Sequence, residues 1–262
     1  MRIGIVGFGY VGRGCFERIE AGLAPGLEIA FVYNRSPGAL AAVPAAKMLP
    51  SLEDFAERGA DLIVEMAHPD ITRRFGAAFL RRADYMPLSV TALADAEIEG
   101  QLLAAAAASR RRLLIPHGAL IGADDLVGAR AYWSEVTITF RKHPRNIDFS
   151  ESGRDASGIG PATVIYDGPA RGIARLFPRN VNTMVSCGLA TVGLDRCRAV
   201  LIADPTLDVA IAEVVERGRD GRIFETRKEQ PMIGVSGTEM LDSQFGSILR
   251  AAGILDTPIA FV

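Results

Sequence analysis

The stretch IVGFGYVGRG, residues 5–14, places Gly7, Gly9 and Gly12 where one apolar pattern gives way to another. The apolar residues up to Val6 form a short run typical of a buried strand, and the apolar positions after Gly9 recur at helical spacing. In a Gly-x-Gly-x-x-Gly turn, the first glycine permits the tight turn, the second lets a ligand approach the backbone, and the third lets the helix pack closely on the strand. Because a helix N-terminus attracts anions, the stretch predicts a turn that binds the pyrophosphate of a dinucleotide. The residues assigned to this turn are Gly7, Gly9, Tyr10, Val11 and Gly12.

Strand-like and helix-like segments alternate through the first half of the chain. Strand patterns occupy residues 2–7, 27–34, 60–67, 84–90 and 113–120. Helix patterns fill the intervals at residues 11–23, 51–59, 69–83 and 95–112, and Ser51 is the expected N-cap of the second of them. Strands separated by helices predict right-handed crossovers and a parallel sheet, and therefore an N-terminal Rossmann domain of the α/β class.

The pattern changes after about residue 125. Strand-like segments richer in Thr and Val follow at residues 135–144, 162–170, 198–205, 208–218 and 221–231, with one clear helix at 180–193. This part predicts a mostly antiparallel sheet in a second, α+β domain for substrate binding and oligomerisation. The expected division is a dinucleotide-binding domain at 1–122, the substrate domain at 123–238, and a helix at 239–262 that returns to the first domain.

The composition is that of a globular protein. Of 262 residues, 49% are hydrophobic and 23% are charged, and the formal net charge is −2. This balance gives no reason to expect binding to nucleic acid or to an acidic membrane surface. The 3 cysteines lack the spacing of a disulfide framework or a metal site, and no segment has the pattern of a signal peptide. No apolar run approaches the roughly 18 residues that span a bilayer. We therefore expect a cytoplasmic protein without a metal and without membrane association.

The end of the second predicted strand bears on the choice of dinucleotide. NAD-preferring sites usually carry Asp or Glu there to bind the ribose hydroxyls. This chain has Asn34, Arg35 and Ser36 instead. Without a carboxylate to repel a 2′-phosphate, and with a guanidinium and a hydroxyl to bind it, the loop predicts NADP as a cofactor alongside NAD. The alternative is that Arg35 only faces water.

Several stretches together resemble the L-aspartate dehydrogenase family, particularly its animal-type branch. They are GIVGFGYVG, FVYNRSP, DLIVEMAHP, SVTALAD, HGALIGADDL, VIYDGPARGIARLFPRNVNT and LIADP, which extend over nearly the whole chain. The resemblance implies a Rossmann domain with a second, substrate-binding domain. It also implies NAD(P)-dependent oxidation of L-aspartate to iminoaspartate, a precursor for pyridine nucleotide biosynthesis, and reductive amination in reverse. A homodimer or a higher homo-oligomer is expected.

Further candidate cofactor residues come from the resemblance and from the predicted sheet. The resemblance places Ala119 and Asn182 at cofactor-contacting positions. The carboxyl ends of parallel strands, where ligands bind in such sheets, add four more. They are Ala67 and His68 after the third strand, and Ala92 and Leu93 after the fourth.

One departure from the family concerns proton transfer. Bacterial and archaeal members carry an Asn-x-His pair after their Asp-Pro motif, and the histidine is the expected catalytic group; here the two positions are Ala210 and Ala212. Oxidation of an amine still requires a group that accepts the ammonium proton. The candidates are His68, then His117, with Asn180 to orient the amine. Cations that could face a dicarboxylate are Arg141, Lys142, His143, Arg171, Arg175 and Arg179.

The sequence leaves two alternatives to an aspartate dehydrogenase. One is another NAD(P)-dependent reductase of a small substrate, of the dihydrodipicolinate reductase or homoserine dehydrogenase type. The other is a dinucleotide-binding protein without catalysis, which the alanine at position 212 favours. The FPRNVNT and HGALIG segments, which a mere dinucleotide sensor would not need, count against the second alternative.

Overall fold

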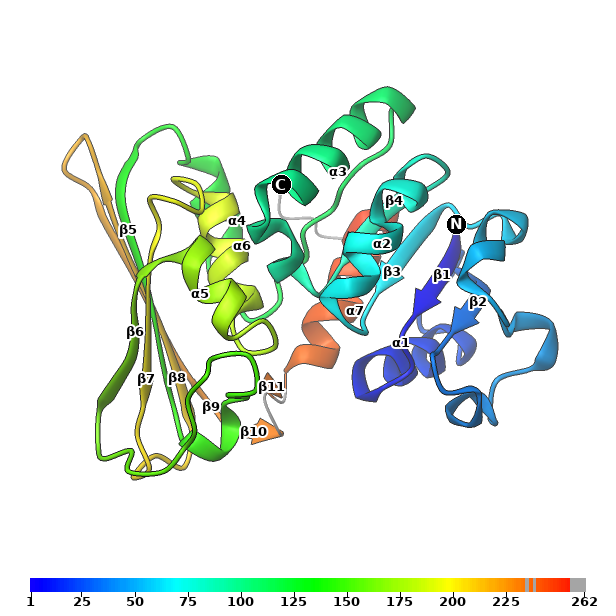
Figure 1. The fold of residues 1–262 in the computed structure, drawn as a ribbon. Coiled ribbons are helices and arrows are strands. Elements are labelled where there is room, and N and C mark those ends of the chain that lie inside the picture. The colour runs from blue at the N-terminus through cyan, green and yellow to red at the C-terminus, as the bar shows by residue number, and fades with distance from the viewer. Residues whose placement is uncertain (234–235, 238, 255–262) are drawn as a thin grey trace. The chain divides into compact units, whose positions relative to one another are not determined.

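The computed structural model describes residues 1–233, 236–237 and 239–254, which form two compact units. The first unit contains residues 1–89 and 97–116 and the chain from residue 241 onward, and the second contains residues 90–96 and 117–240. Figure 1 shows the elements of both units along the chain. Residues 255–262 of the expected C-terminal segment lie outside the described residues.

The first unit is built on a parallel sheet with the strand order β2-β1-β3-β4. Its strands are β1 (Arg2–Val6), β2 (Glu28–Tyr33), β3 (Leu62–Glu65) and β4 (Asp84–Pro87). Its helices are α1 (Tyr10–Glu20), α2 (Pro69–Leu80), α3 (Ala96–Ser109) and α7 (Met240–Ala252), which joins the unit from its second residue. Short 3-10 helices lie at Pro37–Leu40, Ala45–Lys47 and Leu52–Arg58. The predicted N-terminal α/β domain with a parallel sheet is confirmed.

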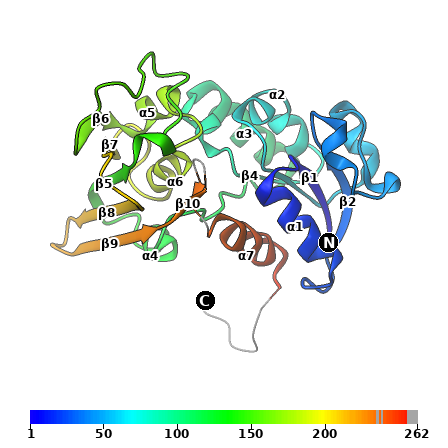
Figure 2. The same cartoon turned by 90° about the horizontal axis from the view of Figure 1, so that it is seen from below.

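Helices cover both faces of this parallel sheet, as Figures 1 and 2 show. On one face, Cys15 of α1 and Ile248 of α7 are buried in one apolar cluster with Ile5 of β1. On the other face, Phe79 of α2 contacts the ring of Tyr85 of β4. Both faces are therefore apolar, which is why these strands show continuous apolar runs rather than alternation.

The fifth strand predicted at residues 113–120 is wrong. Only Leu113 forms an isolated parallel bridge, with Tyr85. Pro116 has no N–H to continue a ladder, and Gly118 has a φ of +57°, so the chain turns here. The helix predicted at 51–59 is a 3-10 helix, with Ser51 as its side-chain cap as expected.

The second unit is built on a mixed sheet with the strand order β6-β7-β5-β8-β9. Its strands are β5 (Trp133–Lys142), β6 (Thr163–Pro169), β7 (Arg198–Ala203), β8 (Ala210–Gly218) and β9 (Ile223–Gln230). Its helices are α4 (Ala123–Gly128), α5 (Ala170–Leu176) and α6 (Asn182–Ala190), with 3-10 helices at Val90–Ala94 and Pro144–Asn146. A two-stranded ribbon joins β10 (Met232–Ile233) to β11 (Ser236–Gly237).

The second unit agrees with the prediction in its sheet and differs from it in its helices. Only β5 and β7 pair in parallel, so the expectation of a mostly antiparallel sheet is confirmed. The expectation of one helix is wrong, because α4 and α5 accompany α6 within the described residues. Both are short, and seven residues or fewer give little periodicity to recognise. The three helices lie on one face of the sheet (Figure 1).

Candidate functional site

The glycine turn between β1 and α1 is closely packed at two of its glycines and open at the third. Gly7 has a φ of +100°, and a Cβ atom there would lie 2.6 Å from the carbonyl oxygen of Met66. A Cβ atom on Gly12 would overlap the carbonyl oxygen of Gly7. At Gly9, nothing lies within 4 Å of the Cβ position. The turn therefore requires two glycines for its own packing, and leaves the third exposed to an approaching ligand.

The first turn of α1 has no acceptor of its own for its free N–H groups. Gly9 is the N-cap and offers no side chain, and no acidic residue lies in the first turn. The positive end of the helix dipole therefore faces the open side of the turn without a compensating acidic residue in the first turn of the helix. These residues fit the pyrophosphate of a dinucleotide, which brings both acceptors and negative charge.

The end of β2 braces the glycine turn. Asn34 accepts a hydrogen bond from the Phe8 N–H at 3.1 Å and donates one to the Ser36 carbonyl at 3.1 Å. Arg35 and Ser36 are exposed beyond the strand. The side chain of Asn34 is thus occupied in holding two loops together, and the cation and hydroxyl beside it are the groups available to a ligand.

Glu65, the last residue of β3, is a buried carboxylate that the sequence analysis did not consider. One of its oxygens accepts hydrogen bonds from the N–H groups of Ala67 and His68, at 2.6 and 2.8 Å, and from the Ser89 hydroxyl. Burial raises the pKa of Glu65 to about 7, and these donors act in the opposite direction. A glutamate that ends an otherwise apolar strand was the signal in the sequence. Its role is to fix the loop that carries the candidate residues Ala67 and His68.

His68 itself caps a helix. Its Nδ1 accepts a hydrogen bond from the N–H of Asp70 at 3.3 Å, as the N-cap of α2. The imidazole is half exposed, and the Asp70 carboxylate lies 3.2 Å from Nδ1. The structure therefore gives His68 a structural task, and its use as a proton acceptor stays a prediction.

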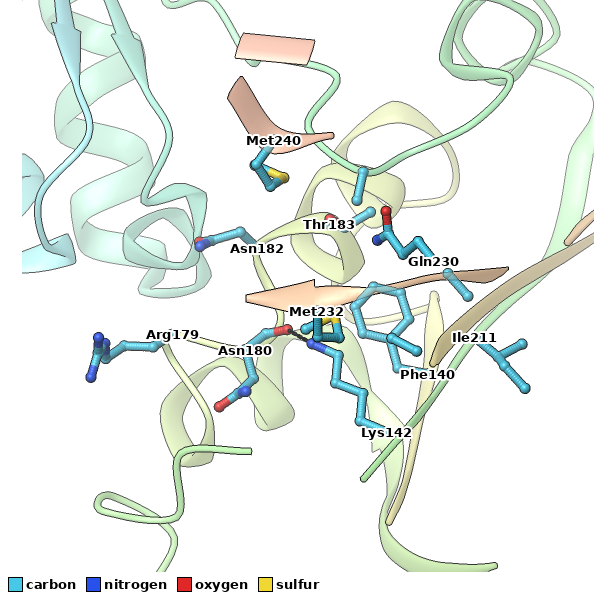
Figure 3. Close-up of a pocket in the computed structure, with 13 residues that line it drawn as sticks. Phe140, Lys142, Arg179, Asn180, Asn182, Thr183, Ile211, Gln230, Met232 and Met240 are labelled. Carbon is cyan, nitrogen blue, oxygen red and sulfur yellow. Dashed lines mark hydrogen bonds between the residues drawn. The ribbon is translucent and has the colours of Figure 1, made fainter. Parts of the chain in front are cut away.

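A pocket in the second unit collects candidate residues from several elements (Figure 3). Its charged lining residues, among those described, are Lys142 at the end of β5 and Arg179 after α5. The other lining residues are Ala119, Phe140, Asn180, Asn182, Thr183, Ala210, Ile211, Ala212, Gln230, Met232 and Met240. The pocket therefore combines two cations and several amides with an apolar wall.

Lys142, the last residue of β5, lines this pocket, and its neighbours Arg141 and His143 do not. Alternation along the strand places Phe140 and Lys142 on one face, both buried. Arg141 points to the other face and pairs with Glu213 on β8 at 3.3 Å. His143 caps a 3-10 helix by accepting a hydrogen bond from Arg145 N–H. The sequence showed three neighbouring cations, and the strand geometry selects one.

The ammonium of Lys142 has a neutral partner. Its Nζ donates a hydrogen bond to the backbone carbonyl of Asn180 at 3.3 Å and lies 5.0 Å from the centre of the Phe140 ring (Figure 3). Burial lowers the pKa of Lys142 to about 8, against a smaller upward effect of the Glu239 carboxylate. Part of this lysine is therefore neutral near physiological pH.

The two asparagines of the FPRNVNT segment have different tasks. Asn180 accepts a hydrogen bond from the Asp148 N–H at 2.9 Å and donates one to the Asn146 carbonyl at 3.0 Å. Its amide thus holds a neighbouring loop, while its backbone carbonyl holds Lys142. Asn182 accepts a hydrogen bond from Thr91 N–H at 3.0 Å, and its NH2 group has no partner in the part of the chain that is described. Of the two, Asn182 has the freer donor.

The remaining candidate site residues either do not line this pocket or have buried side chains. Arg171 pairs with Asp195 at 2.7 Å, and Arg175 does not line the pocket. His117 lies before α4, with Nε2 3.5 Å from Asp124 Oδ1, and does not line the pocket either. Ala92 and Leu93 are 0% and 2% exposed, so only their backbone can meet a ligand. In the described residues, no group of His, Cys, Asp and Glu forms a metal site.

Comparison with known proteins agrees with this geometry in both halves of the chain. Residues 7–116 match the family described as homoserine dehydrogenase, NAD binding domain, and residues 126–234 match aspartate dehydrogenase, C-terminal. An aspartate dehydrogenase domain-containing protein of Xenopus tropicalis is 36% identical, with 97% of this chain and 95% of that protein covered. The chain belongs to the aspartate dehydrogenase family.

Two further relatives extend the comparison. An L-aspartate dehydrogenase of Methanosarcina acetivorans is 34% identical over 87% of this chain and 88% of its own. The crystal structure of aspartate dehydrogenase from Thermotoga maritima covers 100% of this chain and 99% of its own, with a TM-score of 0.76 at 24% identity, and shares the fold. This member of the family is an NAD(P)-dependent dehydrogenase. None of its described helices is long and apolar enough to cross a membrane.

Proposed function

We propose that this dehydrogenase oxidises L-aspartate to the imine with NADP or NAD, and catalyses reductive amination in the reverse direction. The observation that carries the proposal is the pocket of the second unit, in which Lys142 and Arg179 are the charged lining groups among the described residues. Arg179 donates one hydrogen bond to Asp148 at 2.8 Å, and its remaining donors can bind a substrate carboxylate. No described lining residue is a carboxylate that would repel a second acidic group of the substrate. The names of the relatives, L-aspartate dehydrogenase among them, support the same substrate.

The remaining lining of the pocket suits a short substrate. Amide groups of Asn182 and Gln230 offer hydrogen bonds without charge, and Phe140 and Met232 exclude water. The nicotinamide supplies the hydride acceptor when it is bound, and the protein supplies placement and proton transfer. An imine formed in this way would be available to pyridine nucleotide biosynthesis.

The proposed cofactor preference includes NADP, because no carboxylate ends β2. Arg35 and Ser36 are exposed at that position, next to the glycine turn. A guanidinium binds a 2′-phosphate through charge-assisted hydrogen bonds, which a neutral ribose hydroxyl would not receive with the same strength. NADP is therefore expected to bind at least as well as NAD.

We further place the enzyme in the cytoplasm as a homodimer or a higher homo-oligomer. All three cysteines are buried free thiols, which suits a reducing compartment. The three helices of the second unit cover one face of its sheet (Figure 1), and Val164 and Ile223 on its edge strands are 52% and 55% exposed. Light scattering on the purified protein tests the assembly, and a monomer would contradict it.

Steady-state assays with NADP and NAD on a panel of amino acids test the proposed function. The panel contains aspartate, asparagine, glutamate, alanine and homoserine. Aspartate should exceed asparagine by at least about tenfold in kcat/KM, because the amide cannot pair with a cation. Homoserine as the preferred substrate would favour the other reductase class. Dinucleotide binding by calorimetry without turnover of any amino acid would favour the non-catalytic alternative that Ala212 suggests.

A further inference from the structure

The β8 wall of the pocket in the second unit carries apolar side chains. Ala210 and Ala212 both line the pocket, so a histidine at 212 would have entered it from β8. Ala212 is the register partner of Phe140 on β5, and Lys142 follows two residues later on the same face. Lys142 therefore lines the pocket next to a β8 wall whose described lining residues cannot transfer a proton.

Lys142 is the one described lining residue that can accept a proton near neutral pH. The other ionisable lining residue is Arg179, and a guanidinium does not release its proton in proteins. The asparagines, the glutamine and the threonine of the lining do not titrate in this range. Any proton transfer within this pocket by a protein side chain thus falls to Lys142.

The surroundings of Lys142 suit proton exchange better than permanent charge. Its side chain is buried, with 6% of the residue exposed, and it forms no ion pair with a described carboxylate. Buried lysines are otherwise almost always paired. One of the three donor positions of the ammonium is used, by the Asn180 carbonyl, which leaves the nitrogen able to meet a second group.

Two charged side chains on the described elements around Lys142 are Arg179, which pairs with Asp148 at 2.8 Å, and Glu239. Arg179 lines the same pocket, and its side chain points away from Lys142 in Figure 3. Glu239, before α7, attracts the ammonium, but its Oε1 is held by Lys228 of β9 at 2.7 Å. Desolvation is consequently the larger influence on Lys142, and it lowers the pKa of the lysine to about 8.

We infer that Lys142 is the catalytic acid–base of this enzyme, and that it exchanges a proton with the amino nitrogen of the substrate. The inference rests on the proposed oxidation of an amino acid. In that direction, the neutral amine of Lys142 takes one proton from the substrate ammonium and becomes an ammonium itself. The substrate, now a free amine, loses a hydride from its α carbon to the nicotinamide ring of NAD(P)⁺ and leaves as the protonated imine. In reverse, the lysine returns the proton to the amine nitrogen.

The competing role for Lys142 is a fixed positive charge that anchors a substrate carboxylate. Lys142→Arg separates the two, because arginine keeps the charge and cannot give up its proton. If Lys142 is the proton acceptor, kcat should fall by about 10²- to 10⁴-fold in Lys142→Arg and in the smaller Lys142→Met. The KM for aspartate should change by less than about threefold in Lys142→Arg. Arg141→Gln, a neighbouring cation on the other face of β5, is the matched control and should keep its activity.

The pH profile gives an independent readout. In the wild-type enzyme, kcat/KM should fall as the pH decreases below about 8, because protonated Lys142 cannot accept a proton. Both Lys142 variants should lose this limb. Cofactor binding by calorimetry verifies that each variant is folded. Because methionine is smaller than arginine, a loss of kcat in Lys142→Met cannot result from an arginine side chain too large for the pocket.

The outcomes distinguish this inference from the proposed function. If Lys142→Arg retains kcat, or Lys142→Met only raises the KM, the lysine is a carboxylate anchor; the inference is then overturned and the proposed function stands. If the wild-type enzyme binds the dinucleotide and oxidises no amino acid, the proposed function fails and the inference falls with it. A large loss of kcat in both variants together with loss of the acidic limb supports the assignment.

Discussion

The ends of the parallel strands show what single residues contribute beyond their motif. Gly7 and Gly12 are required by backbone contacts that a Cβ atom would break, which is a property the motif predicts. Glu65 is different, because its importance comes from hydrogen bonds to residues on two loops, at 67–68 and at 89. The sequence shows that a glutamate ends an apolar strand. It does not show which loops will donate hydrogen bonds to its carboxylate oxygens.

Asn34→Asp tests the assignment of the loop after β2. An aspartate keeps the acceptor for the Phe8 N–H, and adds a charge that repels a 2′-phosphate and binds ribose hydroxyls. The ratio of NADP to NAD affinity should fall by about tenfold or more, equivalent to about 1.4 kcal/mol. Calorimetry with both dinucleotides measures it. Arg35→Gln is the companion variant, in which only NADP should bind more weakly.

Two results would contradict the assignment of 2′-phosphate binding to the loop after β2. A wild-type enzyme that already prefers NAD by more than about tenfold would show that Arg35 only faces water. Equal loss of NAD and NADP affinity in Asn34→Asp would show instead that the brace between the two loops had been broken, since the hydrogen bond to the Ser36 carbonyl is lost in that variant.

At the scale of elements, the predictions succeeded where periodicity was long and failed where it was short. The first four strands and the helices around them are present, because apolar runs and helical stripes extend over many residues. Residues 113–120 were apolar enough for a strand, but Pro116 and Gly118 redirect the chain. At the end of β5, the sequence RKH offers three candidate residues, and the alternation of side chains along the strand places Lys142 in the pocket.

Helix α2 offers a test that separates the structural role of His68 from a catalytic one. Asparagine is a strong N-cap, so His68→Asn should keep the helix and its stability, whereas His68→Ala should lose about 1 kcal/mol. Because Lys142 is the inferred proton acceptor, kcat on aspartate should be unchanged in His68→Asn. Urea unfolding and steady-state kinetics give the two readouts. A loss of kcat of a hundredfold or more in His68→Asn, with unchanged stability, would show that His68 and not Lys142 is the catalytic residue.

At the scale of the whole molecule, each unit has its own task. The first presents an open glycine turn at a helix N-terminus, and the second presents a pocket with a buried lysine. The glycine turn could be predicted from the sequence because its motif is local, whereas the burial of Lys142 in a pocket could not. The sequence also did not predict the segment at residues 90–96 as part of the second unit, where Thr91 bonds to Asn182. Such a contact joins residues 91 positions apart, and no local pattern records it.

A buried lysine kept for proton exchange should lower the stability of the folded chain. The pKa of Lys142 is lowered from 10.5 to about 8 in the folded protein, so the unfolded chain binds more protons between these values. The lysine therefore destabilises the fold fully below about pH 8, and this cost disappears as the pH rises toward 10.5. Lys142→Met removes the charge and keeps an unbranched apolar side chain. Its free energy of unfolding should exceed that of the wild type by about 1–3 kcal/mol at pH 6.5.

The sign and the pH dependence together make this prediction specific. The advantage of Lys142→Met should shrink between pH 8 and pH 10, because the lysine of the folded wild type loses its proton in this range and no longer buries a charge. Urea unfolding at pH 6.5 and at pH 10 measures the difference. The control is Arg141→Met, at a half-buried ion-pair residue, and its free energy of unfolding should change by less than about 1 kcal/mol at either pH. A variant less stable than the wild type at pH 6.5 would mean that the Asn180 carbonyl and Glu239 hold a stable ammonium. A more stable but inactive Lys142→Met would instead show that the enzyme gives up stability at this position to keep a proton acceptor in an apolar pocket.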